Sequence, residues 1–220
     1  MILVTDVTKA YTTRAGQVKA LDHISLEIAE GEFVAVRGPS GSGKTTLLMA
    51  IAGMLRPTSG TVKVGQQELY GLSQRERAVY RAKNIGFVFQ MFHLVPYLNI
   101  SENVLLAPRI EGAGNRQAEA TRVLDQLGLA DRATHKPAEL SAGEKQRTAI
   151  ARALLNCPKV ILADEPTGNL DPENADTVVK YLADFQRQGG TVVVATHGPA
   201  AEASATRVIN LREGRLDDVG

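Results

Sequence analysis

The segment GPSGSGKTT, residues 38–46, constrains the fold more than any other part of the chain. It matches the pattern G-x-x-x-x-G-K-[ST], and it lies between an apolar stretch typical of a strand and a helix predicted over residues 44–54, as the pattern requires. Glycines let such a loop wrap closely, so that its N–H groups form a phosphate nest. The predicted phosphate site consists of Gly38, Pro39, Ser40, Gly41, Ser42, Gly43, Lys44, Thr45 and Thr46.

Two side chains of this loop carry chemistry of their own. Lys44 is expected to reach the β- and γ-phosphates of a nucleotide, and the Thr45 hydroxyl is expected to ligate Mg²⁺. A chance glycine-rich turn is the weaker interpretation, because a strand and a helix flank the loop in the required order. The sequence therefore predicts that the chain binds a nucleoside triphosphate together with Mg²⁺.

Two carboxylates end the segment VILADEP, residues 160–166, which is typical of a buried strand. A carboxylate at the end of such a strand, opposite a phosphate loop, is placed to contact Mg²⁺, and Asp164 fits this position. Glu165 is predicted to face the γ-phosphate, where it could orient or deprotonate a water molecule. A helix-capping or ion-paired acid is the alternative interpretation.

Gln90 and His197 each end a predicted strand, over residues 84–90 and 191–197. The Gln90 amide could touch Mg²⁺ or the attacking water, and an ordinary polar strand end is the alternative. The His197 ring could hydrogen-bond the γ-phosphate, since an apolar strand holds it firmly. A satisfied histidine at a strand end explains the same pattern.

The segment LSAGEKQRTAIARAL, residues 140–154, predicts an amphipathic helix with Lys145, Arg147 and Arg152 towards solvent. Ser141 and Glu144, three residues apart, fit a capping box. The small residues of this first turn equally fit an anion site, because free N–H groups and the helix dipole favour negative charge. The pattern alone leaves both interpretations open.

Strands and helices alternate along much of the chain. After the strand at 159–166, a helix is predicted to start at Asp171-Pro172, and residues 207–216 are typical of a closing hairpin. Residues 91–140 have a helical pattern and are expected to form an insertion. This alternation implies an α/β fold with a mainly parallel sheet.

Charge and composition exclude several classes of protein. With 25 basic and 24 acidic residues the formal charge is +1, so a general nucleic-acid binder is not expected. The single cysteine excludes an intrachain disulfide. The amino terminus lacks the pattern of a signal peptide, and no apolar stretch approaches the ~20 residues that span a bilayer. We expect a soluble protein that contacts a membrane only through a partner.

Taken together, these motifs resemble those of the ATP-binding-cassette (ABC) ATPases over essentially the whole chain. The order is specific: phosphate loop at 38–45, Gln90, LSAGEKQR at 140–147, VILADE at 160–165, NLD at 169–171, and His197. LSGGQ-like sequence is diagnostic of that family. The segments GPSGSGKTTLL, GFVFQMFHLVPYLNISENV and ADEPTGNLD are most similar to the branch of lipoprotein-release, macrolide-export and cell-division ATPases, which work with permeases bearing large extracytoplasmic domains.

The resemblance implies a P-loop NTPase (RecA-like) fold. It would have a mainly parallel core sheet with helices on both faces, an N-terminal antiparallel β-subdomain and an inserted helical subdomain. Residues 1–220 would form a single nucleotide-binding domain for ATP and Mg²⁺. The ATP-binding core with the β-subdomain would cover 1–90 and 156–220, and the helical signature subdomain would cover about 91–155.

The resemblance also implies a head-to-tail homodimer in the ATP-bound state. The signature helix of one subunit would point at the γ-phosphate held by the phosphate loop of the other. Ser141, Ala142, Gly143 and Glu144 would then contact nucleotide, and the first three would be small because the nucleotide lies against them. The capping box and the anion site are compatible, since Ser141 can cap when free and contact phosphate when paired.

Further roles follow position by position. Tyr11 matches the aromatic residue that stacks on adenine, although it could equally be a strand tyrosine. Asp171 matches the loop that contacts the opposite subunit, and it would also cap the next helix. The groove that receives a permease's coupling helix matches the residues just after Gln90, including Phe92, Leu94, Pro96 and Tyr97. These apolar residues could instead pack the helical insertion.

Two departures from the family pattern bear on these roles. Ala142 replaces the usual first glycine of the signature. Alanine would be strained by about 1–2 kcal/mol if this position had a positive φ, but it suits the first position of a helix. We favour the helical position. Gly198-Pro199 follows His197 where the branch usually has Asp-Pro. This departure puts in doubt the contact that the aspartate makes in the branch, but it does not affect the role of His197.

The leading hypothesis is an ATPase subunit that drives an integral-membrane permease for export or extraction of lipoprotein, lipid or drug. It would lie in the cytoplasm, peripherally on the cytoplasmic face of the inner membrane. One alternative is a mechanotransmission ATPase of the cell-division type, which moves no substrate. Another is a soluble DNA-repair or translation ATPase, which the lack of a long coiled-coil insertion and of a basic face disfavours.

Overall fold

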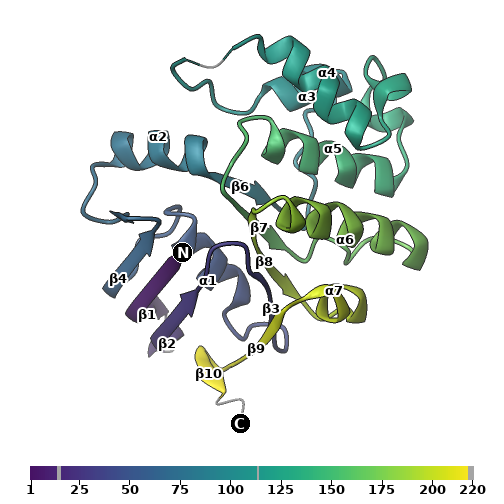
Figure 1. Ribbon diagram of the computed structural model, residues 1–220. Helices are drawn as coiled ribbons and strands as arrows, with labels where there is room; N and C mark the ends of the chain where they lie inside the picture. Colours follow the sequence, from purple (N-terminus) through teal and green to yellow (C-terminus); the bar gives the residue numbers. More distant parts are fainter. Residues whose placement is uncertain (14–15, 113, 218–220) are drawn as a thin grey trace.

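The structure is a computed structural model that describes residues 1–13, 16–112 and 114–217 (Figure 1). Its strands form two sheets. The strands are β1 (Ile2–Thr13), β2 (Gly16–Ile28), β3 (Phe33–Arg37), β4 (Ser59–Val64), β5 (Gln67–Glu68), β6 (Ile85–Val88), β7 (Val160–Asp164), β8 (Thr191–Thr196), β9 (Arg207–Arg212) and β10 (Arg215–Asp217). The helices are α1 (Lys44–Ile51), α2 (Gln74–Asn84), α3 (Ile100–Leu105), α4 (Arg116–Gln126), α5 (Ala142–Leu154), α6 (Pro172–Arg187) and α7 (Pro199–Ser204), with 3-10 turns η1 (Ala130–Arg132) and η2 (Pro137–Glu139).

The larger sheet has the strand order β10-β9-β3-β8-β7-β6. The strands from β9 to β6 are parallel, and β10 pairs with β9 in the antiparallel sense. Arg37 pairs with Thr196, and Asp164 pairs with Ala195. The carboxyl ends of β3, β8 and β7 therefore lie side by side at one edge of the sheet, where ligands bind in open α/β folds.

Both faces of this sheet are buried, which explains why its strands are apolar without alternation. Val160 and Leu162 of β7 belong to one core with α1 and the smaller sheet. Ile161 and Ala163 point to the opposite face, into a core that includes residues of α3 to α7. The prediction of a mainly parallel sheet with helices on both faces is confirmed.

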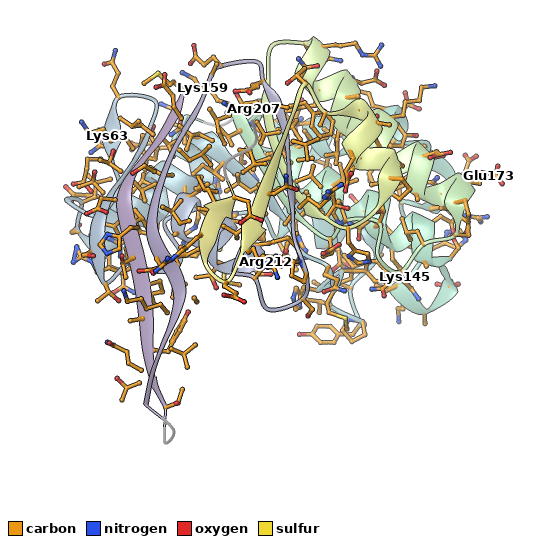
Figure 2. All side chains as sticks on the ribbon, turned by 90° about the horizontal axis from the view of Figure 1, so that it is seen from below. Lys63, Lys145, Lys159, Glu173, Arg207 and Arg212 are labelled. Carbon is orange, nitrogen blue, oxygen red and sulfur yellow. The ribbon has the colours of Figure 1, made fainter. Side chains whose placement is uncertain are left out.

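The smaller sheet is antiparallel, with the order β2-β1-β4-β5. It packs over α1, which lies between the two sheets (Figure 1). Its long strands β1 and β2 run out from the body as a two-stranded ribbon (Figure 2). The alternating apolar residues of β2 are buried: Leu21, Ile24, Leu26 and Ile28. This sheet corresponds to the expected N-terminal antiparallel β-subdomain.

The segment 91–155 differs from the expected pattern at its start. Residues 91–99 are not helical, and the first helix of the segment is α3. The fully buried Asn103 amide satisfies the backbone here: its Nδ2 donates to the carbonyls of Val95, Leu98 and Asn99, and its Oδ1 accepts from the Val95 N–H. The apolar core of α3, α4 and α5 is continuous with that of α6 and β7. A separate helical subdomain over 91–155 therefore stays a proposal.

Three other features of the structure differ from the sequence-based expectations. Helix α2 was not predicted; it has no buried residue, so it carries little apolar pattern. Helix α1 ends at Ile51 instead of Met54, since Gly53 takes a positive φ of 67°. Arg152 does not point to solvent: it donates to the carbonyls of His93 and Phe92 at 2.7 and 2.9 Å, and burial lowers the pKa of its guanidinium.

In the part of the chain that the structure describes, no helix has the length and apolar character needed to cross a membrane.

The Asn103 network gives a test of this packing. Asn103→Asp replaces an amide group that shares its two hydrogens among three carbonyls by a buried carboxylate facing the same carbonyls, so we expect the free energy of unfolding to fall by about 2–4 kcal/mol. Asn115→Asp is the matched control. Asn115 caps α4 through its oxygen alone, and aspartate caps equally well. Urea unfolding of both variants measures the difference, and equal losses would contradict the assigned role of Asn103.

Candidate functional site

The phosphate loop follows β3 and leads into α1, as its sequence pattern requires. Gly43 has a φ of 108°, and a Cβ at this position would lie 2.3 Å from the carbonyl oxygen of Ala20 in β2. Only glycine fits there. The loop closes on itself, because the Ser42 N–H donates to the Pro39 carbonyl at 3.2 Å. The buried Ser42 hydroxyl has no partner in the described residues.

Lys44 lies inside this loop and is 8% exposed. Its Nζ donates to the carbonyls of Gly38 and Pro39 at 2.8 and 3.3 Å, and it lies 3.5 Å from Oε1 of Glu165. The lysine therefore stands between the loop and the end of β7. A buried ammonium with exchangeable partners is suited to take up a phosphate oxygen.

Thr45 and Asp164 form the second contact between α1 and β7. The Thr45 hydroxyl donates to Oδ1 of Asp164 at 3.0 Å. Asp164 is the last residue of β7 and is 7% exposed, and burial raises the pKa of its carboxyl group. The pair offers two hard oxygen atoms next to the phosphate loop.

Glu165 connects three elements of the site. Its Oε2 lies 2.9 Å from Nδ1 of His197, beyond the end of β8, while its Oε1 faces Lys44. Its backbone φ is 46°, in the left-handed region, and its N–H donates to the Ala195 carbonyl at 2.8 Å. A non-glycine residue in such a conformation costs about 1–3 kcal/mol and persists where the surroundings enforce it. The turn aims the carboxylate across the strand ends.

Gln90 lies two residues beyond β6, beside the turn that follows Glu165. Its carbonyl accepts from Asn169 Nδ2 at 3.4 Å, and its Nε2 lies 3.6 Å from the place of a Cβ on Gly168. Tyr11 lies farther out, on β1. Its ring is 42% exposed, and Lys9 Nζ is 5.2 Å from the ring centroid.

The signature segment begins α5 as a capping box. The Ser141 hydroxyl accepts from the Glu144 N–H at 3.2 Å, and Glu144 Oε2 accepts from the Ser141 N–H at 2.8 Å. These hydrogen bonds hold the pKa of Glu144 below its usual range. Ala142 is the first helical residue, so the helical interpretation of this departure is confirmed.

Gly143 has a reason to be small that lies within this chain. A Cβ on Gly143 would be 2.1 Å from Oδ1 of Asn174, in the first turn of α6. Asn174 Nδ2 in turn donates to Asp171 Oδ2 at 2.7 Å, and Asp171 caps α6 by accepting from the Asn174 N–H. Asn174 thus connects the signature to Asp171, and the sequence interpretation missed it.

The site is therefore divided. The loop residues, Asp164, Glu165 and His197 meet at the strand ends, whereas Ser141, Ala142 and Asp171 form no hydrogen bond or ion pair with the loop in residues 1–13, 16–112 and 114–217. A cavity of about 1030 Å³ lies elsewhere, at the amino ends of β7 and β8, and none of the predicted site residues lines it.

Comparison with known proteins decides the family. The family model described as "ABC transporter" matches residues 21–168, about two thirds of the chain. The chain belongs to the ABC transporter family.

Individual relatives agree with the assignment to ABC transporters. The chain is 44% identical to the lipoprotein-releasing system ATP-binding protein LolD of Maricaulis maris, over 96% of this chain and 93% of that protein. It is also 44% identical to the macrolide export ATP-binding/permease protein MacB of Chlorobaculum tepidum, over 99% of this chain and 34% of that protein. A solved dimer of the ATP-binding cassette MJ0796 bound to ADP and Pi superposes with a TM-score of 0.91 at 38% identity, covering 99% and 97%. The predicted ABC family and P-loop NTPase fold are confirmed.

The contact between Gly143 and Asn174 gives a test of how this ABC signature is held. Gly143→Ala places a methyl group against Asn174, so we expect it to lower the free energy of unfolding by about 1–3 kcal/mol. In an Asn174→Ala background the oxygen is gone, and the helix propensity of alanine should make the same change neutral or stabilising. Gly114→Ala, where an added Cβ meets nothing, is the control. Additive effects in a double-mutant cycle would contradict the contact.

The buried Asp164 gives a second test, on the pH dependence of stability. Because burial raises its pKa in the folded state, the unfolded chain loses this proton first as pH rises, and stability falls. Asp164→Asn carries no such penalty, so without nucleotide its Tm should exceed that of wild type at pH 7. The difference should vanish below about pH 4, near the carboxyl's unperturbed pKa. The measurement is the Tm of Asp164→Asn and of wild type over a series of pH values. Asp176→Asn, at an exposed aspartate, is the control. A Tm of Asp164→Asn below that of wild type at pH 7 would refute the burial penalty.

Proposed function

We propose that the chain is the ATP-binding and ATP-hydrolysing subunit of an ABC transporter, and that ATP-driven homodimerisation in it powers a separate membrane permease. The observation that carries this proposal is that the Glu165 carboxylate lies 3.5 Å from Lys44 and 2.9 Å from His197, beyond the carboxyl ends of parallel strands. Such a cluster suits phosphoryl transfer, which depends on positioning and electrostatic stabilisation.

Nucleotide binding rests on the phosphate loop. Its N–H groups and the start of α1 would hold the β- and γ-phosphates, with Lys44 exchanging its loop carbonyls for phosphate oxygens. Tyr11, exposed on β1, would stack on adenine. Ser42 would give its unpartnered hydroxyl hydrogen to the bound phosphates.

The donor set at Thr45 and Asp164 fits Mg²⁺. This ion takes hard oxygen ligands and is commonly held by one or two protein groups plus substrate phosphates. In keeping with this, the described residues contain no group of three or more His, Cys, Asp or Glu side chains that could hold a metal by themselves. Gln90 would supply a further amide oxygen. Bound Mg²⁺ would neutralise charge that develops on the phosphates.

Hydrolysis would be carried by Glu165. Its carboxylate would take a proton from a water molecule that attacks the γ-phosphorus, the bond to the β,γ-bridging oxygen would break, and ADP and phosphate would form. His197 would hold the carboxylate through the 2.9 Å contact and would donate to a γ-phosphate oxygen. The Glu165 backbone turn favours this role, because it points the base away from β7.

Homodimerisation would complete each site. The exposed Ser141 and Ala142, with Gly143, Glu144 and Asp171, would meet the nucleotide bound to the opposite subunit. The dimeric ADP- and Pi-bound MJ0796 cassette supports this arrangement. The connection from Gly143 through Asn174 to Asp171 would move the two contacts as one body.

The relatives named for lipoprotein release and macrolide export support a membrane permease of a release or export system as the partner. The permease would contact the apolar residues after Gln90, where Met91 and Tyr97 are 65% and 75% exposed. The chain would act at the cytoplasmic face of the inner membrane and reach it only through the permease, with no nucleic-acid partner.

A Glu165→Gln variant tests the proposed function. It keeps the shape of the base and loses its proton acceptor, so we expect ATP binding to persist while hydrolysis falls by at least roughly a hundredfold. The ATP-bound dimer should accumulate in light scattering. Purified from native membranes with ATP and Mg²⁺, the variant should bring a polytopic permease with it.

Lys44→Ala is the matched control, since it should lose nucleotide affinity and therefore the dimer. A Glu165→Gln protein that stays monomeric at saturating ATP would contradict ATP-driven dimerisation. Recovery of soluble partners or nucleic acid alone would remove the membrane role. A permease that moves no substrate would identify the mechanotransmission class.

A further inference from the structure

The turn between β9 and β10 lies between the phosphate loop and β2. The Gly214 N–H donates to the Ser42 carbonyl at 2.9 Å, and the Gly214 carbonyl accepts from the Asp22 N–H at 2.8 Å. One residue near the carboxyl end of the chain therefore bridges the phosphate loop and β2 through its backbone. A small shift of the hairpin would move the loop relative to β2.

The side chain of Asp22 fixes the position of this hairpin. Arg215 of β10 donates to Asp22 Oδ2 through Nε at 2.8 Å and through Nη2 at 2.6 Å. Lys19 Nζ donates to the other carboxylate oxygen at 2.7 Å. The carboxyl group is 7% exposed, and the hydrogen bonds from Lys19 and Arg215 lower its pKa to about 2. Two nitrogens of a guanidinium on one carboxylate give directional as well as electrostatic attachment.

Strand β2 also bears directly on both ends of the predicted nucleotide site. The Ala20 carbonyl and the Leu21 side chain lie against Gly43 of the phosphate loop, 2.3 and 3.3 Å from the place of a Cβ on it. Farther along the same strand, Val18 pairs with Tyr11. The position of β2 thus sets the separation between Tyr11 and the loop.

We propose that Asp22 and Arg215 are positioning residues for nucleotide binding. They hold Tyr11, on β1, and the phosphate loop at the distance that a nucleotide spans between its adenine ring and its phosphates. This inference rests on the proposed function. Within the described residues, the hydrogen bonds and ion pairs of this pair do not reach β7 or β8, the strands that precede Glu165 and His197. It acts on affinity for ATP and ADP alike and leaves the chemical step unchanged.

The electrostatic sign makes the inference testable. Asp22→Asn removes a negative charge near a loop that binds phosphate, so simple electrostatics predicts tighter nucleotide binding. Positioning predicts the opposite, because the carboxylate that anchors the hairpin is lost.

The experiment compares three variants of the full chain with wild type. Asp22→Asn should raise the KM for ATP and the calorimetric Kd for both ATP and ADP roughly tenfold, with kcat changed less than about twofold. Arg215→Lys keeps the charge and loses the two-nitrogen contact, so it should give a smaller rise. The control is Arg212→Gln, which removes a cation from the other arm of the same hairpin, at an exposed side chain that is labelled in Figure 2. It should leave KM and Kd unchanged.

A second readout tests the separation itself. In a Tyr11→Ala background there is no ring to position against the adenine. Asp22→Asn should therefore weaken ATP binding much less than it does in wild type. Should Asp22→Asn fail to fold, Arg215→Lys alone and in the Tyr11→Ala background carries the same comparison.

Several results would overturn the inference. Tighter or unchanged ATP binding in Asp22→Asn would refute positioning, as would full additivity with Tyr11→Ala. A lowered Tm with unchanged KM would make the pair merely structural. Wild-type protein that binds no ATP would refute the proposed function instead, which separates the two failures.

Discussion

The parallel pairing of β3, β8 and β7 is the constraint on which the candidate site depends. In this register Arg37 faces Thr196 and Asp164 faces Ala195, so the residues that follow each strand emerge at one edge. The phosphate loop is distant in sequence from Glu165 and His197, yet Lys44 and His197 both contact the Glu165 carboxylate. A register shift of one residue would turn Asp164 to the opposite face of the sheet and separate it from Thr45.

Much of this arrangement could be predicted because its signals are local. The glycine loop, the caps at Ser141 and Asp171 and the buried strand before Asp164 each depend on a few neighbouring residues. What escaped prediction depends on contacts between distant segments. Asn174 resembles any polar residue in a first helical turn, and only the packing of α5 on α6 makes it the neighbour of Gly143. Arg152 likewise has a surface pattern, but its guanidinium holds the carbonyls of Phe92 and His93.

The Gly143 contact changes the explanation of the small signature residues. The resemblance to ABC ATPases attributes their size to a nucleotide held by the opposite subunit, while the structure places Asn174 of the same chain 2.1 Å from where a Cβ of Gly143 would be. The two reasons apply to different residues. Ser141 and Ala142 are exposed at the start of α5 and remain available to a partner, whereas Gly143 is buried. Intramolecular packing therefore fixes the helix start that a second subunit would use.

Several features of the site lower the stability of the protein in order to hold reactive groups in place. Glu165 has a left-handed backbone, Asp164 is a buried carboxylate with a raised pKa, and the Ser42 hydroxyl is buried without a partner in the described residues. Each is unfavourable by itself. The proposed cation would balance the Asp164 charge, and the proposed nucleotide would accept a hydrogen bond from Ser42. Ligand binding would therefore offset these two costs and stabilise the folded protein. A site relaxed in the free protein would bind nucleotide with less effect on its stability.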